Sequence, residues 1–121
     1  MLEQFSWQDR LKSFRFAFAG IATLIVEQHN ARVHFLATIA VIFLGLYLQI
    51  TGAEWIYLVL IISLVWVGEA FNSAIEYLAD AAVPEQNTMI KKAKDVAAAG
   101  VLICAFGAVV IGILVFFPYF F

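Results

Sequence analysis

The chain has 121 residues, of which 64% are hydrophobic and only 13% are charged, and its mean hydropathy is +0.96. A soluble domain of this length cannot bury so much apolar surface, so lipid must solvate much of the chain. The net charge of −2 gives no electrostatic basis for a nucleic-acid partner, and the single cysteine excludes an intramolecular disulfide. We therefore expect one all-α, membrane-embedded domain over residues 1–121.

The first predicted element is a helix over about residues 5–28. Apolar side chains recur there at helical spacing on one side, and the basic side chains Arg10, Lys12 and Arg15 take the other. The fully apolar part, 17–26, is too short to cross a bilayer. We expect an amphipathic helix lying in the membrane interface, with packing against a partner protein as the alternative.

Three later stretches are apolar and long enough to cross a bilayer, over about residues 33–50, 55–78 and 96–117. The connection 51–54 is so short that the first two spans must form an antiparallel hairpin. The connection between the second and third spans is longer and polar, and Pro84 breaks the helix there.

The positive charges predict the orientation of these spans. Every lysine and arginine lies before the first span or between the second and third: Arg10, Lys12, Arg15, Arg32, Lys91, Lys92 and Lys94. By the positive-inside rule, the N-terminus and the second connection are cytoplasmic, and the C-terminus is external.

The second span carries an unusual polar stripe, formed by Glu69, Asn72, Ser73, Glu76 and Asp80. At about 100° per residue, the other four positions lie within roughly 60° of Glu69, so all five share one helix face. A carboxylate costs about 2.5–3.5 kcal/mol near a bilayer centre, so the stripe indicates a functional site. The alternative is an interhelical polar network that holds an oligomer together. Oxygen ligands of this kind suit Mg²⁺.

Two further polar clusters flank the spans. Before the third span, Asp95 follows three lysines; it adds nothing to orientation, and capping of a helix N-terminus is its simplest alternative role. The segment 27–34 contains His29 and His34, whose five-residue spacing does not place two metal ligands on one helix face, so zinc is not expected; a plain interfacial turn is the alternative. Glycine-rich phosphate-binding motifs are absent from the sequence.

The pattern Glu69-Ala-Phe-Asn72-Ser73-Ala-Ile-Glu76, followed by Asp80 and by Ala93-Lys94-Asp95, closely resembles the small bacterial integral-membrane diacylglycerol kinase/undecaprenol kinase family. The resemblance extends to the amphipathic N-terminus, the three spans and the chain length. It implies a homotrimer in the bacterial cytoplasmic membrane that uses Mg²⁺ and ATP to phosphorylate a lipid alcohol. The active sites would lie at the cytoplasmic interface and be shared between protomers.

The resemblance also implies roles for individual residues. Glu69 is similar to the general base that meets the lipid hydroxyl, and Glu76 to the carboxylate that binds metal and nucleotide. Asn72, with Ser73 and Asp80, would orient the site. The other nucleotide contacts implied are Arg10, Phe16, Glu85, Gln86, Asn87, Lys94 and Asp95, and the other lipid contacts are Arg32 and Ala98.

Two points remain open on the sequence. Family members often carry a second metal-binding glutamate where this chain has Gln28, so Glu27 replaces it, Gln28 binds through its amide oxygen, or one contact is lost; we favour Glu27. The segment Asn30-Ala-Arg32-Val-His34 resembles the undecaprenol kinase branch, with diacylglycerol as the alternative substrate. A non-enzymatic transporter or assembly subunit is the rival class.

Overall fold

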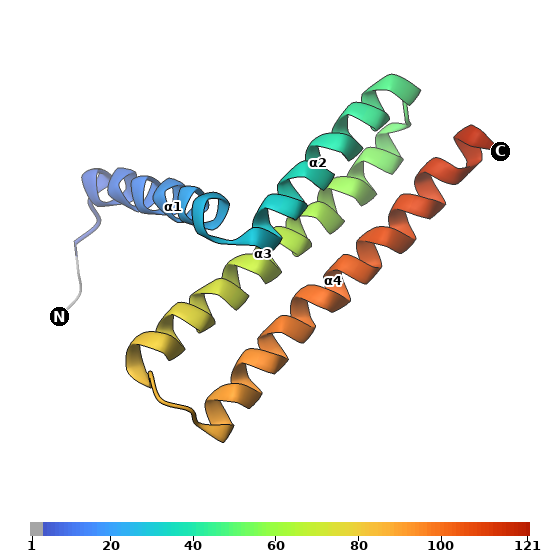
Figure 1. Ribbon diagram of the computed structural model, residues 1–121. Helices are drawn as coiled ribbons and strands as arrows, with labels where there is room; N and C mark the ends of the chain where they lie inside the picture. The colour runs from blue at the N-terminus through green and yellow to red at the C-terminus, as the bar shows by residue number, and fades with distance from the viewer. Residues whose placement is uncertain (1–3) are drawn as a thin grey trace.

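The computed structural model describes residues 4–121, which form four helices and no strand. These are α1 (Trp7–Glu27), α2 (His29–Leu48), α3 (Gly52–Ala82) and α4 (Thr88–Phe120). By length and composition, α2, α3 and α4 could each cross a membrane. The predicted all-α membrane fold, with three apolar helices after an amphipathic one, is confirmed (Figure 1).

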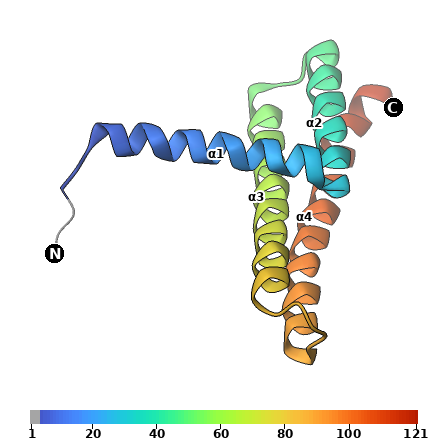
Figure 2. The ribbon, with the colours of Figure 1, turned by 60° about the vertical axis from the view of Figure 1, so that its left-hand side comes forward.

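The three long helices run side by side as two consecutive hairpins, and α1 lies crosswise to them (Figure 2). A single residue in extended conformation, Gln28 (φ −105°, ψ 117°), separates α1 from α2 and turns the chain. The guanidinium of Arg32 donates to the carbonyl oxygens of Ile25, at 2.8 Å, and Val26. These carbonyls belong to the last turn of α1 and have no partner within that helix, so Arg32 secures the junction.

The apolar side of α1 has no protein covering it. Leu24, near the junction, is its one buried side chain, whereas Trp7, Leu11 and Phe14 are each 65–75% exposed. An uncovered apolar stripe on a helix that lies across the membrane-spanning helices is the arrangement expected of an interfacial helix.

The second hairpin extends well beyond the first turn of α2 (Figure 1). Helix α3 ends two residues before Pro84, and α4 begins at Thr88, where the Asn87 side chain accepts hydrogen bonds from the backbone N–H groups of Met89 and Ile90. The alternative that Asp95 caps this helix is therefore wrong: Asp95 lies two turns inside α4 and pairs with Lys91 at 2.6 Å.

The opposite end of the bundle holds the helices in register. Thr51 and Glu54 form a reciprocal capping box at the start of α3. The hydroxyl of Tyr119, in the last turn of α4, donates to the Glu54 carboxylate at 2.6 Å. Beneath these contacts lies a buried apolar cluster that includes Leu58 and Phe116. The end of α4 is thus tied to the α2–α3 turn, far from the polar stripe.

Candidate active site

The polar stripe of α3 changes from buried to exposed along the helix. Glu69 and Ser73 are 1% exposed and Asn72 is 6% exposed, whereas Glu76 is half-buried and Asp80 is exposed. At 1.5 Å per residue, Glu76 lies about 10 Å from Glu69 along the helix, and Asp80 about 16 Å from it. One helix face therefore runs from a deep carboxylate to solvent-accessible ones.

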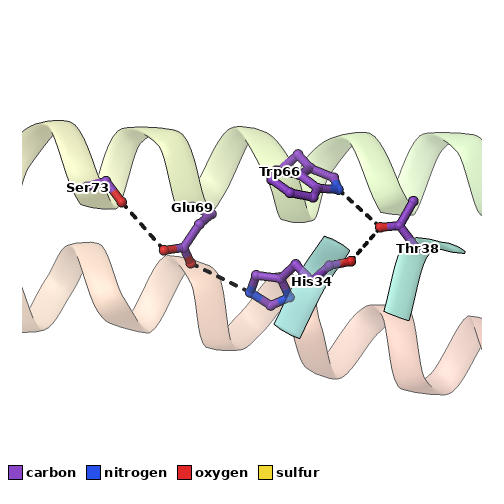
Figure 3. A network of polar contacts seen from close by, with 5 residues as sticks. All are labelled: His34, Thr38, Trp66, Glu69 and Ser73. Carbon is purple, nitrogen blue, oxygen red and sulfur yellow. Dashed lines mark hydrogen bonds and ion pairs between the residues drawn. The ribbon is translucent and has the colours of Figure 1, made fainter. Parts of the chain in front are cut away.

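Glu69 lies in a polar network between α2 and α3 (Figure 3). The Ser73 hydroxyl donates to Glu69 Oε1 at 3.5 Å, and His34 Nε2 lies 3.6 Å from Glu69 Oε2. On the other side, the Thr38 hydroxyl donates to the His34 carbonyl oxygen at 2.6 Å and accepts from the Trp66 indole N–H at 3.1 Å. The buried carboxylate is therefore positioned by side chains from both helices.

Two buried acceptor atoms of the stripe have no hydrogen-bond partner, namely Glu69 Oε2 and Asn72 Oδ1. An unsatisfied buried acceptor costs about 1–3 kcal/mol and calls for an explanation. Both atoms belong to side chains on the same face of α3. They are suited to receive a proton donor, such as the hydroxyl group of a substrate.

Helix α4 approaches α3 closely beside Glu69. A Cβ placed on Gly68 would lie 3.8 Å from the Cα of Val101, which is ordinary van der Waals contact. The small residue therefore lets the backbone of α4 pass next to the buried carboxylate, and Val101 is itself buried there.

An apolar groove of about 720 Å³ runs along α2 and α4, with α3 at its base. Its polar side chains are His34 and Thr38, and its wall continues to Phe117 and Phe121 at the end of α4. Because His34 lines the groove and also lies beside Glu69, the groove leads to the buried carboxylate.

A polar pocket of about 680 Å³ lies at the α3–α4 connection. Lys94 forms an ion pair there with Asp80, Nζ to Oδ1, at 2.5 Å. Lys94, Asp80 at the outer end of the polar stripe, and the segment that connects α3 to α4 thus all line the same pocket. Its lining includes five of the residues singled out in the sequence: Asp80, Glu85, Gln86, Asn87 and Lys94.

Glu27 and Gln28, the alternatives for the second metal contact, both meet Tyr77 of α3. The Gln28 amide donates to the Tyr77 hydroxyl at 3.0 Å, and that hydroxyl donates to Glu27 Oε2 at 3.0 Å. Since Tyr77 follows Glu76 directly, the α1–α2 junction lies at the level of the Glu76 carboxylate along α3.

The carboxylates near Glu76 suit an Mg²⁺ ion that is bound jointly by protein and substrate, and they do not form a complete metal site by themselves. Within residues 4–121, no three His, Cys, Asp or Glu side chains gather closely enough to hold an ion. Mg²⁺ is usually bound by one or two carboxylates together with substrate phosphates. Glu76 and Glu27 are two such carboxylates at one level of the bundle.

Several residues singled out in the sequence lie apart from this cluster. Arg10 and Phe16 are exposed residues of α1, the helix that lies across the bundle and whose N-terminal part projects away from it (Figure 2). Arg32 is engaged at the end of α1, and Ala98 is exposed on α4, one turn before Val101. Asp95 pairs with Lys91 near the polar pocket, whose lining includes that lysine.

Sequence reasoning missed four members of the site. The sequence predicts no contact of His34 with Glu69, and Thr38, Trp66 and Tyr77 have no part in the expected site. Each acts through a contact between helices, at a sequence separation of 28 to 50 residues. No local spacing signals such a contact, although the position of Tyr77 beside Glu76 is a weak hint.

Comparison with known proteins identifies the family of this chain. The sequence model of the prokaryotic diacylglycerol kinase family matches residues 15–116. Over 115 residues, the chain is 35% identical to a diacylglycerol kinase of Synechocystis sp., a match covering 92% of this chain and 66% of that relative. Over 107 residues, it is 33% identical to an undecaprenol kinase of Bacillus subtilis, covering 88% of this chain and 87% of that relative. The chain therefore belongs to the prokaryotic diacylglycerol kinase family of membrane lipid kinases, as its motif predicted.

Proposed function

We propose that this chain transfers the γ-phosphate of ATP to the hydroxyl group of undecaprenol, giving undecaprenyl phosphate and ADP. One observation carries the proposal: a polar pocket, a half-buried carboxylate, a buried carboxylate and an apolar groove follow one another along α3. A water-soluble phosphoryl donor and a membrane lipid need such an order if they are to meet. The transporter and assembly-subunit alternatives do not account for it, and they do not fit a family of lipid kinases.

The nucleotide is proposed to occupy the polar pocket. Lys94 provides positive charge for the phosphates and is preorganised by its ion pair with Asp80. Glu85, Gln86 and Asn87 offer polar groups along the connecting segment. Phosphoryl transfer requires mainly positioning and charge neutralisation, and these side chains are suited to both.

Glu69 is proposed to act as the general base. Its Oε2 takes the proton of the lipid hydroxyl while the hydroxyl oxygen forms a bond to the γ-phosphorus and the bond from that phosphorus to ADP breaks. Asn72, whose Oδ1 has no hydrogen-bond partner and which lies on the same face of α3, helps to orient the reacting groups. Burial excludes water that would otherwise compete for the phosphoryl group.

Mg²⁺ is the proposed metal, and it would supply neutralisation of the negative charge on the phosphates. Glu76 would hold it, with Glu27 as the second protein ligand. Glu27 is favoured over Gln28 because it alone carries a charge, and because the Gln28 amide already donates to Tyr77.

The groove supports a polyprenol over a diacylglycerol. Among its lining residues, His34 and Thr38 are the polar ones, and the Thr38 hydroxyl already donates and accepts a hydrogen bond within the protein. A polyprenol presents one hydroxyl on a hydrocarbon chain and needs few polar partners. A diacylglycerol also carries two ester groups, which would lack donors in this groove.

We further propose a homotrimer in the bacterial cytoplasmic membrane, with the α3–α4 connection in the cytoplasm. The distribution of the seven basic residues supports the orientation. Arg10 and Phe16 are exposed and do not line the polar pocket of their own chain, which supports sites shared between protomers, as the family resemblance implies.

The test is a phosphorylation assay on the purified full-length protein in micelles, with ATP, Mg²⁺ and either undecaprenol or diacylglycerol. Undecaprenol should be the faster substrate, and Glu69→Gln should lower kcat by at least about 10²-fold because the base is lost. Glu54→Gln, at the opposite end of the bundle, is the matched control and should retain activity. Faster turnover of diacylglycerol would overturn the choice of lipid, and full activity of Glu69→Gln would overturn the base.

A further inference from the structure

His34 occupies the boundary between the apolar groove and the buried carboxylate. Its imidazole lines the groove, and its Nε2 lies 3.6 Å from Glu69 Oε2, which is the oxygen of that carboxylate without a hydrogen bond (Figure 3). The side chain is 17% exposed, whereas that of Glu69 is 1% exposed. Any lipid hydroxyl that approaches Glu69 from the groove must therefore pass the imidazole.

Hydrogen bonds through Thr38 and Trp66 hold the backbone of His34 against α3 on the side away from Glu69 (Figure 3). The Thr38 hydroxyl donates to the His34 carbonyl oxygen, and the Trp66 indole donates to the Thr38 hydroxyl. Trp66 and Glu69 are three residues apart on α3, and His34 and Thr38 are four residues apart on α2, so each pair lies on one helix face. Two polar contacts, one turn apart, fix the register of α2 against α3 at this level.

The two oxygens of Glu69 are approached from different sides. Ser73, one turn further along α3, donates to Oε1, and His34 faces Oε2 from α2. A carboxylate oxygen can accept more than one hydrogen bond, so Oε2 can face an imidazole N–H and a substrate hydroxyl together. A shift of about 0.6 Å would bring His34 Nε2 to an ordinary hydrogen-bond distance, and contacts of this kind often tighten when substrate binds.

We propose that His34 is a positioning residue for Glu69. Its imidazole donates the Nε2 hydrogen to Glu69 Oε2 and turns the carboxylate toward the end of the groove, where the lipid hydroxyl arrives. This proposal rests on the proposed kinase function. It assigns His34 no covalent step and no direct proton transfer with the substrate.

The test compares three substitutions of His34 in the full-length protein. His34→Gln places an amide N–H where Nε2 lies, His34→Asn is polar but too short to reach Oε2, and His34→Leu fills the space without a donor. Tyr119→Phe is the matched control, since it removes a polar contact between two helices at the opposite end of the bundle, far from His34 and Glu69. Steady-state kinetics for both substrates and the unfolding midpoint are measured for each.

His34→Gln should keep kcat within about threefold of the unsubstituted protein, whereas His34→Asn and His34→Leu should lower it at least tenfold with KM values nearly unchanged. Tyr119→Phe should lower the unfolding midpoint but keep kcat within about twofold. Equal kcat values for His34→Gln and His34→Asn, or full activity of His34→Leu, would overturn the role of His34 alone. An unsubstituted protein that phosphorylates no lipid would overturn the proposed function as well.

Discussion

Glu69 illustrates how single residues create this site. A carboxylate that is 1% exposed in an apolar helix is destabilising unless its surroundings compensate, and only one of its oxygens accepts a hydrogen bond. Glu69 Oε2 and Asn72 Oδ1 are buried in the folded chain and accept no hydrogen bond. Such incomplete satisfaction is expected where a substrate group completes the network, and not where polar residues serve only to hold helices together.

The second metal contact gives a prediction at the same scale. Glu27→Gln removes the charge next to Tyr77 and should raise the Mg²⁺ concentration needed for half-maximal activity about tenfold. Gln28→Leu removes a neutral amide that already donates to Tyr77, and it should change this Mg²⁺ concentration less than threefold. Magnesium titrations at saturating ATP measure both. A larger effect of Gln28→Leu would assign the contact to the amide oxygen.

At the scale of elements, the α2–α3 hairpin sets where the site residues of the two helices meet. Its turn is closed by Gln49 in the left-handed conformation (φ 53°, ψ 51°) and by the Thr51–Glu54 capping box. Trp55 packs directly against Gly45 across the turn. Because both helices are rigid, this packing fixes which residue of α2 faces Glu69, about four turns away from Trp55, and that residue is His34.

Gly45→Ala should therefore destabilise the hairpin. A Cβ at this position would lie 2.7 Å from the Trp55 ring, and overpacking of this kind costs about 1–3 kcal/mol. The unfolding midpoint of the purified protein in micelles measures the effect. Gly20→Ala is the matched control, since nothing lies within 4 Å of its Cβ position, and it should leave the midpoint unchanged or raised. Equal midpoints for the two variants would contradict the close packing.

At the scale of the molecule, the site forms where a lipid-facing groove and a polar pocket approach the same helix. Helices α3 and α4 extend beyond α2, and the pocket lies on this extension. The crosswise α1 meets the bundle between the two, at Gln28 and Tyr77. This level corresponds to a membrane interface in the proposed orientation, so ATP and lipid approach Glu69 from opposite directions.

The orientation can be checked by cysteine labelling of intact bacterial cells. In a chain carrying Cys104→Ala, a cysteine introduced by Ala53→Cys should react with a membrane-impermeant maleimide, because the proposed orientation places the α2–α3 turn outside the cell. A cysteine introduced by Gln86→Cys should react only after lysis, because the proposed orientation places the basic connection in the cytoplasm. Labelling in the reverse order would invert the proposed topology.

Much of this architecture could be predicted because membrane helices are locally encoded. The runs of apolar residues predicted three long helices, and the Glu69–Asp80 stripe predicted one polar face on α3. The Thr51–Glu54 capping box lies in the segment that the sequence predicts as the connection between the first two spans. Asp95 is a candidate cap on the sequence because the apolar run begins at Val96, whereas the helix begins where Asn87 satisfies its first free N–H groups.

The sequence by itself determined that lipid surrounds much of the chain, where the helices lie, and which polar groups the stripe carries. Each of these depends on composition or on spacing along one helix. Only the tertiary structure decided that His34 faces Glu69, that Tyr77 joins Glu27 to Gln28, and that Lys94 closes on Asp80. These contacts depend on the register between helices. That register is set by side-chain packing across tens of residues of sequence, and no local pattern records it.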